Sequence, residues 1–350
     1  MNIIILTGRF GMGHIKAAEA IKEQLEAENP NTSVEIIDFI DYMFPALSKG
    51  IYKTFNFMVS RCSGLYNAIN KAAGKNSGVP MKLTFIRRID KLIKEHHADA
   101  IVVAFPVCSQ YISSYKRMRR CQIPLYTYIT DITAHEEWIA PGTDKYFVGD
   151  ESTKNALLSK GVSGDRVVVS GIPVRRCFFQ ESEEQNGCRE ILIMGGGLGL
   201  IPSSEEFLQK LSRQTDVHIT VITGKNEKLR KTLSEKFPQM NIIGYTDKVS
   251  AYMRQADLLV TKAGGITTFE AIAAGTPLYI IKPFLEQEFG NAKYIEGNNI
   301  GRVLWDRQAD EAEDILELVN DRKLLGDMKK NMETISEAFQ HIRMTDEMAG

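Results

Sequence analysis

A glycine turn followed by hydroxyl side chains occurs where one apolar segment of the chain ends. Residues 258–261 form a short apolar run that is typical of a buried parallel strand. Gly264 and Gly265 then provide a tight turn, and Thr267 starts a segment of good helix formers. The first N–H groups of a helix lack partners within it and carry the positive end of its dipole. This stretch therefore predicts a site for an anion such as a phosphate.

Polar side chains around this turn match the other parts of a nucleotide sugar. Glu270 lies one turn into the predicted helix, where its carboxylate can accept hydrogen bonds from the vicinal hydroxyls of a ribose. Lys262 adds a cation immediately before the turn. A later loop carries Gln287, Glu288 and Asn291, whose side chains can bind sugar hydroxyls. Partners for phosphate, ribose and sugar in this order indicate a nucleotide-sugar donor.

A second glycine loop lies in the same half of the chain. A predicted strand over residues 190–194 leads into it, and the loop contains Gly196, Gly197 and Gly199. Loops of this kind at the ends of parallel strands bind ligands through their backbone amides. We therefore expect this loop to reach a diphosphate from the side opposite Gly264, although a plain turn explains it too.

The first half of the chain offers a proton acceptor. Residues 2–6 read as a strand, and Gly11, Gly13 and His14 follow at the start of a predicted helix. Open α/β sheets bind ligands at this end of a strand, and an imidazole can take a proton from an alcohol near neutral pH. Asp131 ends another predicted strand and can either orient His14 in a dyad or cap its own turn. From its position alone, His14 is also explained as a capping or solvated histidine.

The composition is that of an ordinary globular protein with two domains. The 350 residues exceed a single typical core, and 43% hydrophobic with 25% charged residues is unremarkable. The net charge of −1 gives no global electrostatic signal. Five scattered cysteines without metal spacing favour reduced thiols in the cytoplasm. No apolar run approaches the ~20 residues that span a bilayer, and the first residues do not read as a signal peptide.

Residues 42–95 have a different character, because aromatic and basic side chains alternate there. No acidic residue occurs between positions 45 and 88. A cationic, aromatic segment on an otherwise neutral protein fits an anionic membrane surface. Core helix faces with solvated basic side chains are the alternative explanation. Nucleic acid is not expected as a partner, because no nucleic-acid-binding motif accompanies the basic residues.

The donor half resembles that of the family 28 glycosyltransferases, which include the monogalactosyldiacylglycerol synthases and the processive diacylglycerol glucosyltransferases. The usual proline of the glycine turn is replaced by Ala263, and a usual glycine by Glu286. In similar transferases the turn at Gly244 and Tyr245 reads the uracil edge. The matching positions are Lys262-Ala263-Gly264-Gly265, Thr267-Thr268, Glu270-Ala271, Gly275-Thr276-Pro277, Pro283, Gln287-Glu288 and Asn291-Ala292.

The first half resembles the lipid-glycosylating members of this family. Its Gly-x-Gly-His turn resembles their first motif, and residues 130–138 resemble their T-D-x-x-x-x-H-x-x-W segment. This resemblance implies that His14 is the catalytic base, with Asp131 as its partner. It also implies that Gly11, Gly13 and His135 contact the acceptor.

The resemblance implies the GT-B architecture, an α/β fold in which two Rossmann-like domains place parallel sheets across a cleft. We expect an acceptor domain over residues 1–175, a donor domain over 188–335 and a C-terminal helix over 336–350 that crosses back. The implied activity is inverting transfer of glucose or galactose from a UDP-sugar to diacylglycerol or a related lipid. No metal or other cofactor is expected, since no Asp-x-Asp pair is placed to bridge the diphosphate. The protein would work in the cytoplasm, peripherally on the inner face of the membrane.

Three other hypotheses remain open from the sequence. UDP-sugar 2-epimerases share the GT-B fold and bind the same donor. The acceptor of a transferase can also be something other than diacylglycerol. A non-catalytic sensor of UDP-sugar would keep the donor site without needing His14.

Overall fold

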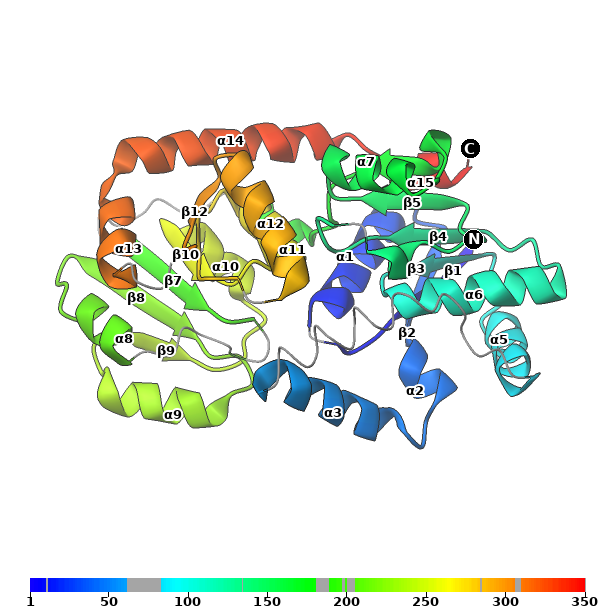
Figure 1. Ribbon diagram of the computed structural model, residues 1–350, viewed down its shortest axis with the longest axis horizontal. Coiled ribbons are helices and arrows are strands. Elements are labelled where there is room, and N and C mark those ends of the chain that lie inside the picture. Colours follow the sequence, from blue (N-terminus) through cyan, green and yellow to red (C-terminus); the bar gives the residue numbers. More distant parts are fainter. Residues whose placement is uncertain are drawn as a thin grey trace. The chain divides into compact units, whose positions relative to one another are not determined.

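The computed structural model describes residues 1–10, 12–61, 83–133, 135–180, 189–196, 199, 205–283, 285–305 and 310–349. The chain divides into two compact units (Figure 1). Unit 1 comprises Met1–Arg175 with His341–Gly350, and unit 2 comprises Arg176–Gln340. Each unit contains a six-stranded sheet, and every strand pair is parallel. The predicted α/β class with two parallel sheets is confirmed.

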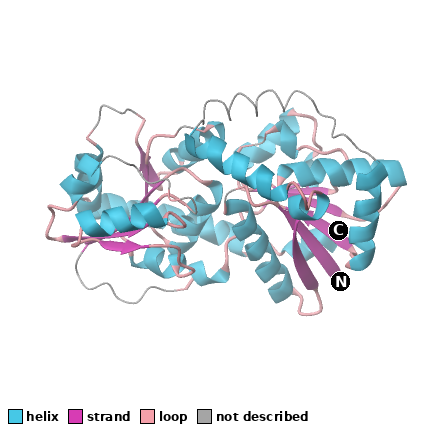
Figure 2. Cartoon of the chain, turned by 90° about the horizontal axis from the view of Figure 1, so that it is seen from below, coloured by secondary structure: helices cyan, strands magenta, loops and turns pink. Residues whose placement is uncertain are grey.

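The sheet of unit 1 has the order β2-β1-β3-β4-β5-β6. Its strands begin at residue 2, as the apolar run predicted, and helices cover both of its faces (Figure 2). The strands are β1 Asn2–Thr7, β2 Ser33–Asp38, β3 Ala100–Val103, β4 Leu125–Tyr128, β5 Lys145–Val148 and β6 Val167–Val169. The helices are α1 Gly13–Glu28, α2 Phe39–Met43, α3 Ser48–Arg61, α5 Leu83–Glu95, α6 Pro106–Arg119, α7 Glu151–Ser159 and α15 Met344–Ala349, with single 3-10 turns at η1 Glu136–Trp138 and η2 Gly164–Arg166.

The two faces of β1 bury different hydrophobic clusters, which explains why the strand is apolar at every position. Ile3 and Ile5 pack in one cluster with Leu25 of α1. Ile4 and Leu6 pack in another, which contains side chains of α5 and α6. A parallel strand covered by helices on both sides is expected to read as such a continuous run.

The sheet of unit 2 has the order β12-β11-β10-β7-β8-β9. The first strand of this unit, β7, is therefore central, and β10 lies beside it. The strands are β7 Arg189–Met194, β8 Val217–Ile222, β9 Asn241–Ile243, β10 Leu258–Thr261, β11 Leu278–Ile280 and β12 Gly301–Val303. The helices are α8 Glu205–Leu211, α9 Glu227–Lys236, α10 Val249–Gln255, α11 Gly265–Ala274, α12 Glu286–Gly297, α13 Glu311–Asn320 and α14 Arg322–Gln340, after the turn η3 Arg176–Phe178.

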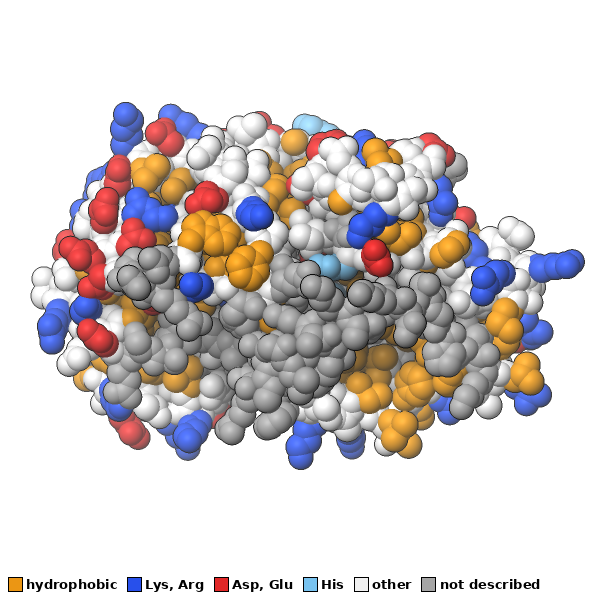
Figure 3. Space-filling model, viewed as in Figure 1, with side chains coloured by type: hydrophobic (Ala, Val, Ile, Leu, Met, Phe, Trp, Pro, Cys, Tyr) orange, Lys and Arg blue, Asp and Glu red, His pale blue; other side chains and the backbone are white. Residues whose placement is uncertain are grey.

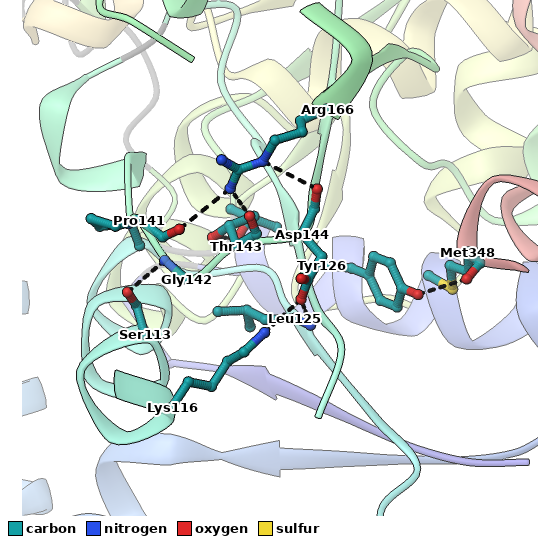
Figure 4. A network of polar contacts seen from close by, with 12 residues as sticks. Ser113, Lys116, Leu125, Tyr126, Pro141, Gly142, Thr143, Asp144, Arg166 and Met348 are labelled. Carbon is teal, nitrogen blue, oxygen red and sulfur yellow. Dashed lines mark hydrogen bonds and ion pairs between the residues drawn. The ribbon is translucent and has the colours of Figure 1, made fainter. Parts of the chain in front are cut away.

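The C-terminal segment packs on unit 1 through side chains of α1 and β4. The Glu28 carboxylate accepts hydrogen bonds from the backbone N–H groups of Met344 at 3.1 Å and Thr345 at 2.8 Å, and so caps α15. Tyr126 donates its hydroxyl to the Met348 carbonyl at 2.7 Å (Figure 4). Residues 336–340 complete α14 of unit 2, so the segment that joins unit 1 begins at His341.

The Asp144 carboxylate joins several polar groups at the start of β4. Its carboxylate accepts hydrogen bonds from Lys116 at 2.6 Å and from the backbone of Leu125 at 2.7 Å (Figure 4). Arg166 donates to the backbone carbonyls of Thr143 and Asp144. These contacts hold the loop before β5 against the first residue of β4.

Among the described residues, no helix combines the length and hydrophobicity that a membrane crossing requires.

Candidate active site

The carboxyl ends of three neighbouring strands of unit 1 bring His14, Phe105 and Thr130 together. His14 lies in the first turn of α1, which follows β1. Phe105 follows β3, and Thr130 follows β4. Since β1, β3 and β4 are adjacent in the sheet, these residues meet at one edge. This is the edge at which open α/β sheets bind ligands.

The imidazole of His14 is contacted by a hydroxyl, a backbone carbonyl and two aromatic rings. Its Nδ1 lies 3.0 Å from the hydroxyl oxygen of Thr130. The ring of Phe105 meets it edge-on with 5.2 Å between centroids, and the ring of Trp138 lies 6.4 Å away. The side chain is thus packed into the sheet edge, which fixes the direction of its ring nitrogens.

Burial lowers the pKa of His14 below its ordinary value of 6.5, because the charged imidazolium loses water. The negative charge of Asp131 and a hydrogen bond to the Ala104 carbonyl raise the pKa and offset part of this effect. The first turn of a helix further disfavours a cation. His14 is therefore neutral at pH 7, as a proton acceptor must be.

The expected His14–Asp131 dyad has a different geometry in the structure. The hydrogen-bond partner of His14 Nδ1 is the hydroxyl of Thr130, and Asp131 acts on the ring through its charge. Thr130 was not among the residues predicted from the sequence, although it precedes Asp131 in the motif and its hydroxyl can hydrogen-bond an imidazole. His135 is engaged locally, because its Nε2 lies 3.1 Å from Thr133 Oγ1. Gly13 is the first residue of α1, and Gly11 lies outside the described residues.

A second polar network, which the sequence did not predict, holds the turn before His14. Tyr52 of α3 donates its hydroxyl to Asp38 at 2.6 Å and accepts the backbone N–H of Arg9 at 3.1 Å. The Arg9 side chain bonds Asp38 at 2.7 Å. Phe10 then stacks on Phe105 with 4.7 Å between ring centroids. This network connects α3 to the aromatic residues that pack against His14.

The strand, glycine turn and helix of unit 2 follow one another in the order that the sequence predicted. Gly264 is the N-cap of α11 and has no side chain that could cap the first N–H groups. Its own amide donates to the Lys262 carbonyl at 2.8 Å. The N–H groups of Gly265, Ile266 and Thr267 form the first turn of α11, where a helix has no intrahelical acceptors for them.

Side chains of α12 hold this turn from the other side. Glu288 is only 2% exposed, and its carboxylate lies 3.2 Å from Lys262 Nζ. It also accepts the Leu285 N–H at 3.3 Å. Asn291 is fully buried and donates to the Ala263 carbonyl at 2.9 Å. Both side chains therefore position the glycine turn and its lysine in this structure.

The second glycine loop lies beside the same lysine. Gly196 has a φ of +69°, and a Cβ added there would lie 3.8 Å from Lys262 Cε. Gly199 has a φ of +63°, and its Cβ would lie 2.2 Å from the Thr223 carbonyl oxygen, so only glycine fits. The Gly199 amide donates to the Gly196 carbonyl at 2.9 Å and closes the turn. Gly197 lies outside the described residues.

The remaining donor-site predictions fall on three elements of unit 2. Glu270 is buried in α11, and Gln287 is partly exposed in the first turn of α12. Gly244 follows β9, and a Cβ there would lie 3.1 Å from Arg230. Tyr245 is exposed, donates to Asp247 at 3.1 Å and has Lys225 over its ring.

Two family models match the chain, one in each half. The model described as monogalactosyldiacylglycerol (MGDG) synthase matches residues 14–174. The glycosyltransferase family 28 C-terminal domain matches residues 191–343. A curated relative, the processive diacylglycerol beta-glucosyltransferase of Bacillus licheniformis, is 29% identical over an alignment of 361 positions that covers 95% of this chain and 91% of that protein.

Solved structures share the fold at low sequence identity. The spinosyn rhamnosyltransferase SpnG has a TM-score of 0.63 at 14% identity and covers 100% of this chain and 98% of its own. A putative UDP-N-acetylglucosamine 2-epimerase from Listeria monocytogenes has a TM-score of 0.59 at 12% identity and covers 97% of both chains. The chain thus belongs to the family 28 glycosyltransferases of GT-B fold, with a first half of the monogalactosyldiacylglycerol synthase type.

Proposed function

We propose that the protein transfers a hexose, glucose or galactose, from a UDP-sugar to diacylglycerol or a related lipid. The observation that carries this proposal is the neutral imidazole of His14 at the strand edge of a unit that matches a lipid-galactosylating family. The name of the Bacillus licheniformis relative supports the same acceptor class. The reaction inverts the anomeric carbon in a single displacement.

Unit 1 supplies the proton acceptor. The imidazole of His14 takes the proton of the acceptor hydroxyl as its oxygen bonds to the anomeric carbon. The bond between that carbon and the diphosphate oxygen breaks, and UDP leaves with the electron pair. The charge of Asp131 stabilises the imidazolium that forms, as the carboxylate of a catalytic triad does. Gly11, Gly13 and His135 are proposed to contact the acceptor.

Unit 2 holds the leaving group. The first N–H groups of α11, from Gly265 to Thr267, and the ammonium of Lys262 face the charge that grows on the diphosphate. Glu288 and Asn291 keep the turn in place, while Gln287 is proposed to bind the sugar. Glu270 is proposed to bind the ribose. The turn at Gly244 and Tyr245 and the loop at Gly196 and Gly199 complete the donor site.

The basic face of α5 is proposed to contact an anionic membrane from the cytoplasmic side. Ile86, Ile89 and Leu92 bury one side of this helix. Its other side exposes basic residues, and Leu83 at its start is 72% exposed. Figure 3 shows basic and hydrophobic side chains gathered over α5 and the end of α6. The exposed basic residues of these two helices are Arg87, Arg88, Lys91, Lys94, Arg117, Arg119 and Arg120.

The test is incubation of the purified protein with radiolabelled UDP-glucose or UDP-galactose, with and without vesicles that contain diacylglycerol. We expect label in the lipid extract only when diacylglycerol is present, and unchanged transfer after EDTA treatment. Conversion of the UDP-sugar without acceptor would instead establish an epimerase. Binding of UDP-sugar with no product on any lipid would leave the sensor hypothesis. Loss of transfer with EDTA would contradict metal independence.

A further inference from the structure

We propose that Tyr52 is a positioning residue for the catalytic base. Its hydroxyl fixes the turn before His14, and that turn keeps Phe105 packed against the imidazole. This inference rests on the proposed transfer reaction with His14 as base. Tyr52 belongs to α3, within residues 42–95, for which the sequence suggested a membrane contact or a core helix face.

The buried hydroxyl of Tyr52 joins the turn before the base to the end of β2. It donates to one carboxylate oxygen of Asp38 at 2.6 Å and accepts the backbone N–H of Arg9 at 3.1 Å. The Arg9 Nε donates to the other oxygen of Asp38 at 2.7 Å, and its guanidinium carbon lies 5.1 Å from the centroid of the Tyr52 ring. Both the backbone and the side chain of Arg9 are therefore tied to the sheet, and the backbone contact depends on the Tyr52 hydroxyl.

Phe10 connects this network to Phe105. Its ring lies 5.0 Å from the ring of Tyr52 and stacks on Phe105 at 4.7 Å, with 8° between the two planes. A Cβ at Gly8 would lie 3.1 Å from the Phe10 ring and 3.4 Å from the Phe105 ring, so both rings pack closely on the backbone there. Because Phe10 directly follows Arg9, a shift of the Arg9 backbone moves the ring on which Phe105 stacks.

The segment that contains Phe105 contacts the base in two ways. The imidazole of His14 is hydrogen-bonded to the carbonyl of Ala104, and the Phe105 ring meets it edge-on at 5.2 Å. These contacts set where the imidazole lies and how it is turned. A misplacement of about 1 Å in a reacting group can cost about 10²-fold in rate. Loss of the support from Phe10 is therefore expected to slow the proton transfer.

The chain provides a matched control in Tyr115. Its hydroxyl donates to Asp90 at 2.7 Å, and Arg119 pairs with the same carboxylate, as Arg9 does with Asp38. Both tyrosines belong to one hydrophobic cluster, Tyr115 with 5% and Tyr52 with 9% exposure. Tyr115 lies roughly 13 Å along α6 from the first residue of that helix, which follows Phe105. A purely structural role of Tyr52 predicts similar results for Tyr52→Phe and Tyr115→Phe.

The experiment compares Tyr52→Phe, Tyr115→Phe and Phe10→Leu in steady-state transfer and in NMR of protein with labelled histidine. We expect Tyr52→Phe to lower kcat about 10-fold, while the KM for the UDP-sugar stays within about twofold because that substrate binds unit 2. Tyr115→Phe keeps kcat near the wild-type value. The ring resonances of His14, assigned through His14→Ala, report the nearby Phe105 ring. They move in Tyr52→Phe and Phe10→Leu and stay in place in Tyr115→Phe.

A double variant tests whether Tyr52 acts through Phe10. Tyr52→Phe with Phe10→Leu should lower kcat no further than the more damaging single substitution, because both remove the same support. Two losses that multiply would show that Tyr52 acts by another route and would overturn the inference. If Tyr52→Phe does not fold, Phe10→Leu decides, since an unchanged kcat in that variant removes the link to Phe105.

Three further outcomes would overturn the inference. These are an unchanged kcat in Tyr52→Phe, an equal loss in Tyr115→Phe, or His14 resonances that do not move in Tyr52→Phe. Failure of the proposed function is a separate result. His14→Ala would then retain transfer, or the wild type would transfer no hexose, whereas the histidine resonances are measured without any substrate.

Discussion

The candidate site residues of unit 1 act through their side chains, whereas those of unit 2 act mainly through backbone amides. In unit 1, the reactive group is a side chain, and side chains hold it: Thr130 by a hydrogen bond, Asp131 by charge and Phe105 by packing. In unit 2, the groups proposed to meet the phosphates are mainly backbone amides at the start of α11. Buried side chains there support the glycine turn, as Asn291 does by donating to the Ala263 carbonyl.

This difference predicts which measured properties change when residues of each unit are substituted. The protein can keep its fold when the catalytic base loses a side-chain partner. Changes in unit 1 should therefore appear in kcat and in the pH profile. Backbone amides have no side chain to remove and depend on the path of the chain. Changes in unit 2 should therefore appear in stability and in donor affinity together.

The largest expected effect is that of Gly199→Ala in unit 2. Its Cβ would lie 2.2 Å from the Thr223 carbonyl oxygen, so the backbone must move. We expect the free energy of unfolding to fall by about 1–3 kcal/mol from the clash, in addition to about 1–2 kcal/mol for the left-handed conformation. Calorimetry of the whole protein should show a lower free energy of unfolding. Titration with UDP should show a lower affinity.

Gly275→Ala is the matched control in the same unit. Gly275 has a φ of +66°, close to that of Gly199, but nothing lies within 4 Å of its Cβ position. Only the left-handed strain should remain in this variant, and UDP affinity should not change. Equal effects of the two substitutions would show that the loop tolerates the extra atom and that the backbone account of unit 2 is mistaken.

The sequence predicted unit 2 better than unit 1 because its constraints are local. A strand, two glycines and a helix are adjacent in the chain, so the geometry of Gly264 and Gly265 follows from their order. Thr130 and His14 are 116 positions apart and meet only because β1, β3 and β4 are neighbours in the sheet. The link from Tyr52 to Arg9 spans 43 positions and was missed for the same reason. The roles proposed for His14 and Asp131 in unit 1, and for the donor-site residues of unit 2, remain predictions.

A smaller effect is expected for the ion pair between Lys262 and Glu288, which joins the glycine turn of unit 2 to α12. Lys262→Met removes the cation and leaves the Glu288 carboxylate, which is 2% exposed, without it. We expect the free energy of unfolding to fall by about 1–3 kcal/mol, because a buried carboxylate loses the cation of its ion pair. The KM for the UDP-sugar should rise as well, because the diphosphate loses a cation. Denaturant unfolding and steady-state kinetics measure the two effects.

A double variant separates these two roles of Lys262. Lys262→Met with Glu288→Gln removes the buried negative charge together with its cation, so stability should largely return while the KM stays high. If both the stability and the KM return to wild-type values, Lys262 supports the fold without contacting the donor. If neither returns, another partner of Glu288 matters more than the lysine.

The smallest expected effect is that of Asp131→Asn, which removes the negative charge that acts on His14. Burial lowers the pKa of His14, and the charge of Asp131 raises it. Asp131→Asn should lower this pKa further, so His14 stays neutral in more acidic solution. The acid limb of kcat/KM, measured from about pH 5 to pH 8, should move to lower pH. At pH 8 kcat should fall, because the imidazolium that forms during the reaction loses the charge of Asp131.

The same pKa shift has a consequence for stability, with a defined sign. The folded-state pKa of His14 lies below the unfolded value of 6.5, so the unfolded chain binds more protons between these two values. The contribution of His14 to stability is thus fully present above pH 6.5 and is lost as the pH falls through its folded-state pKa. Asp131→Asn should deepen this loss in acid while it extends the pH range of activity. If both profiles shift toward higher pH instead, Asp131 does not act on His14 through its negative charge.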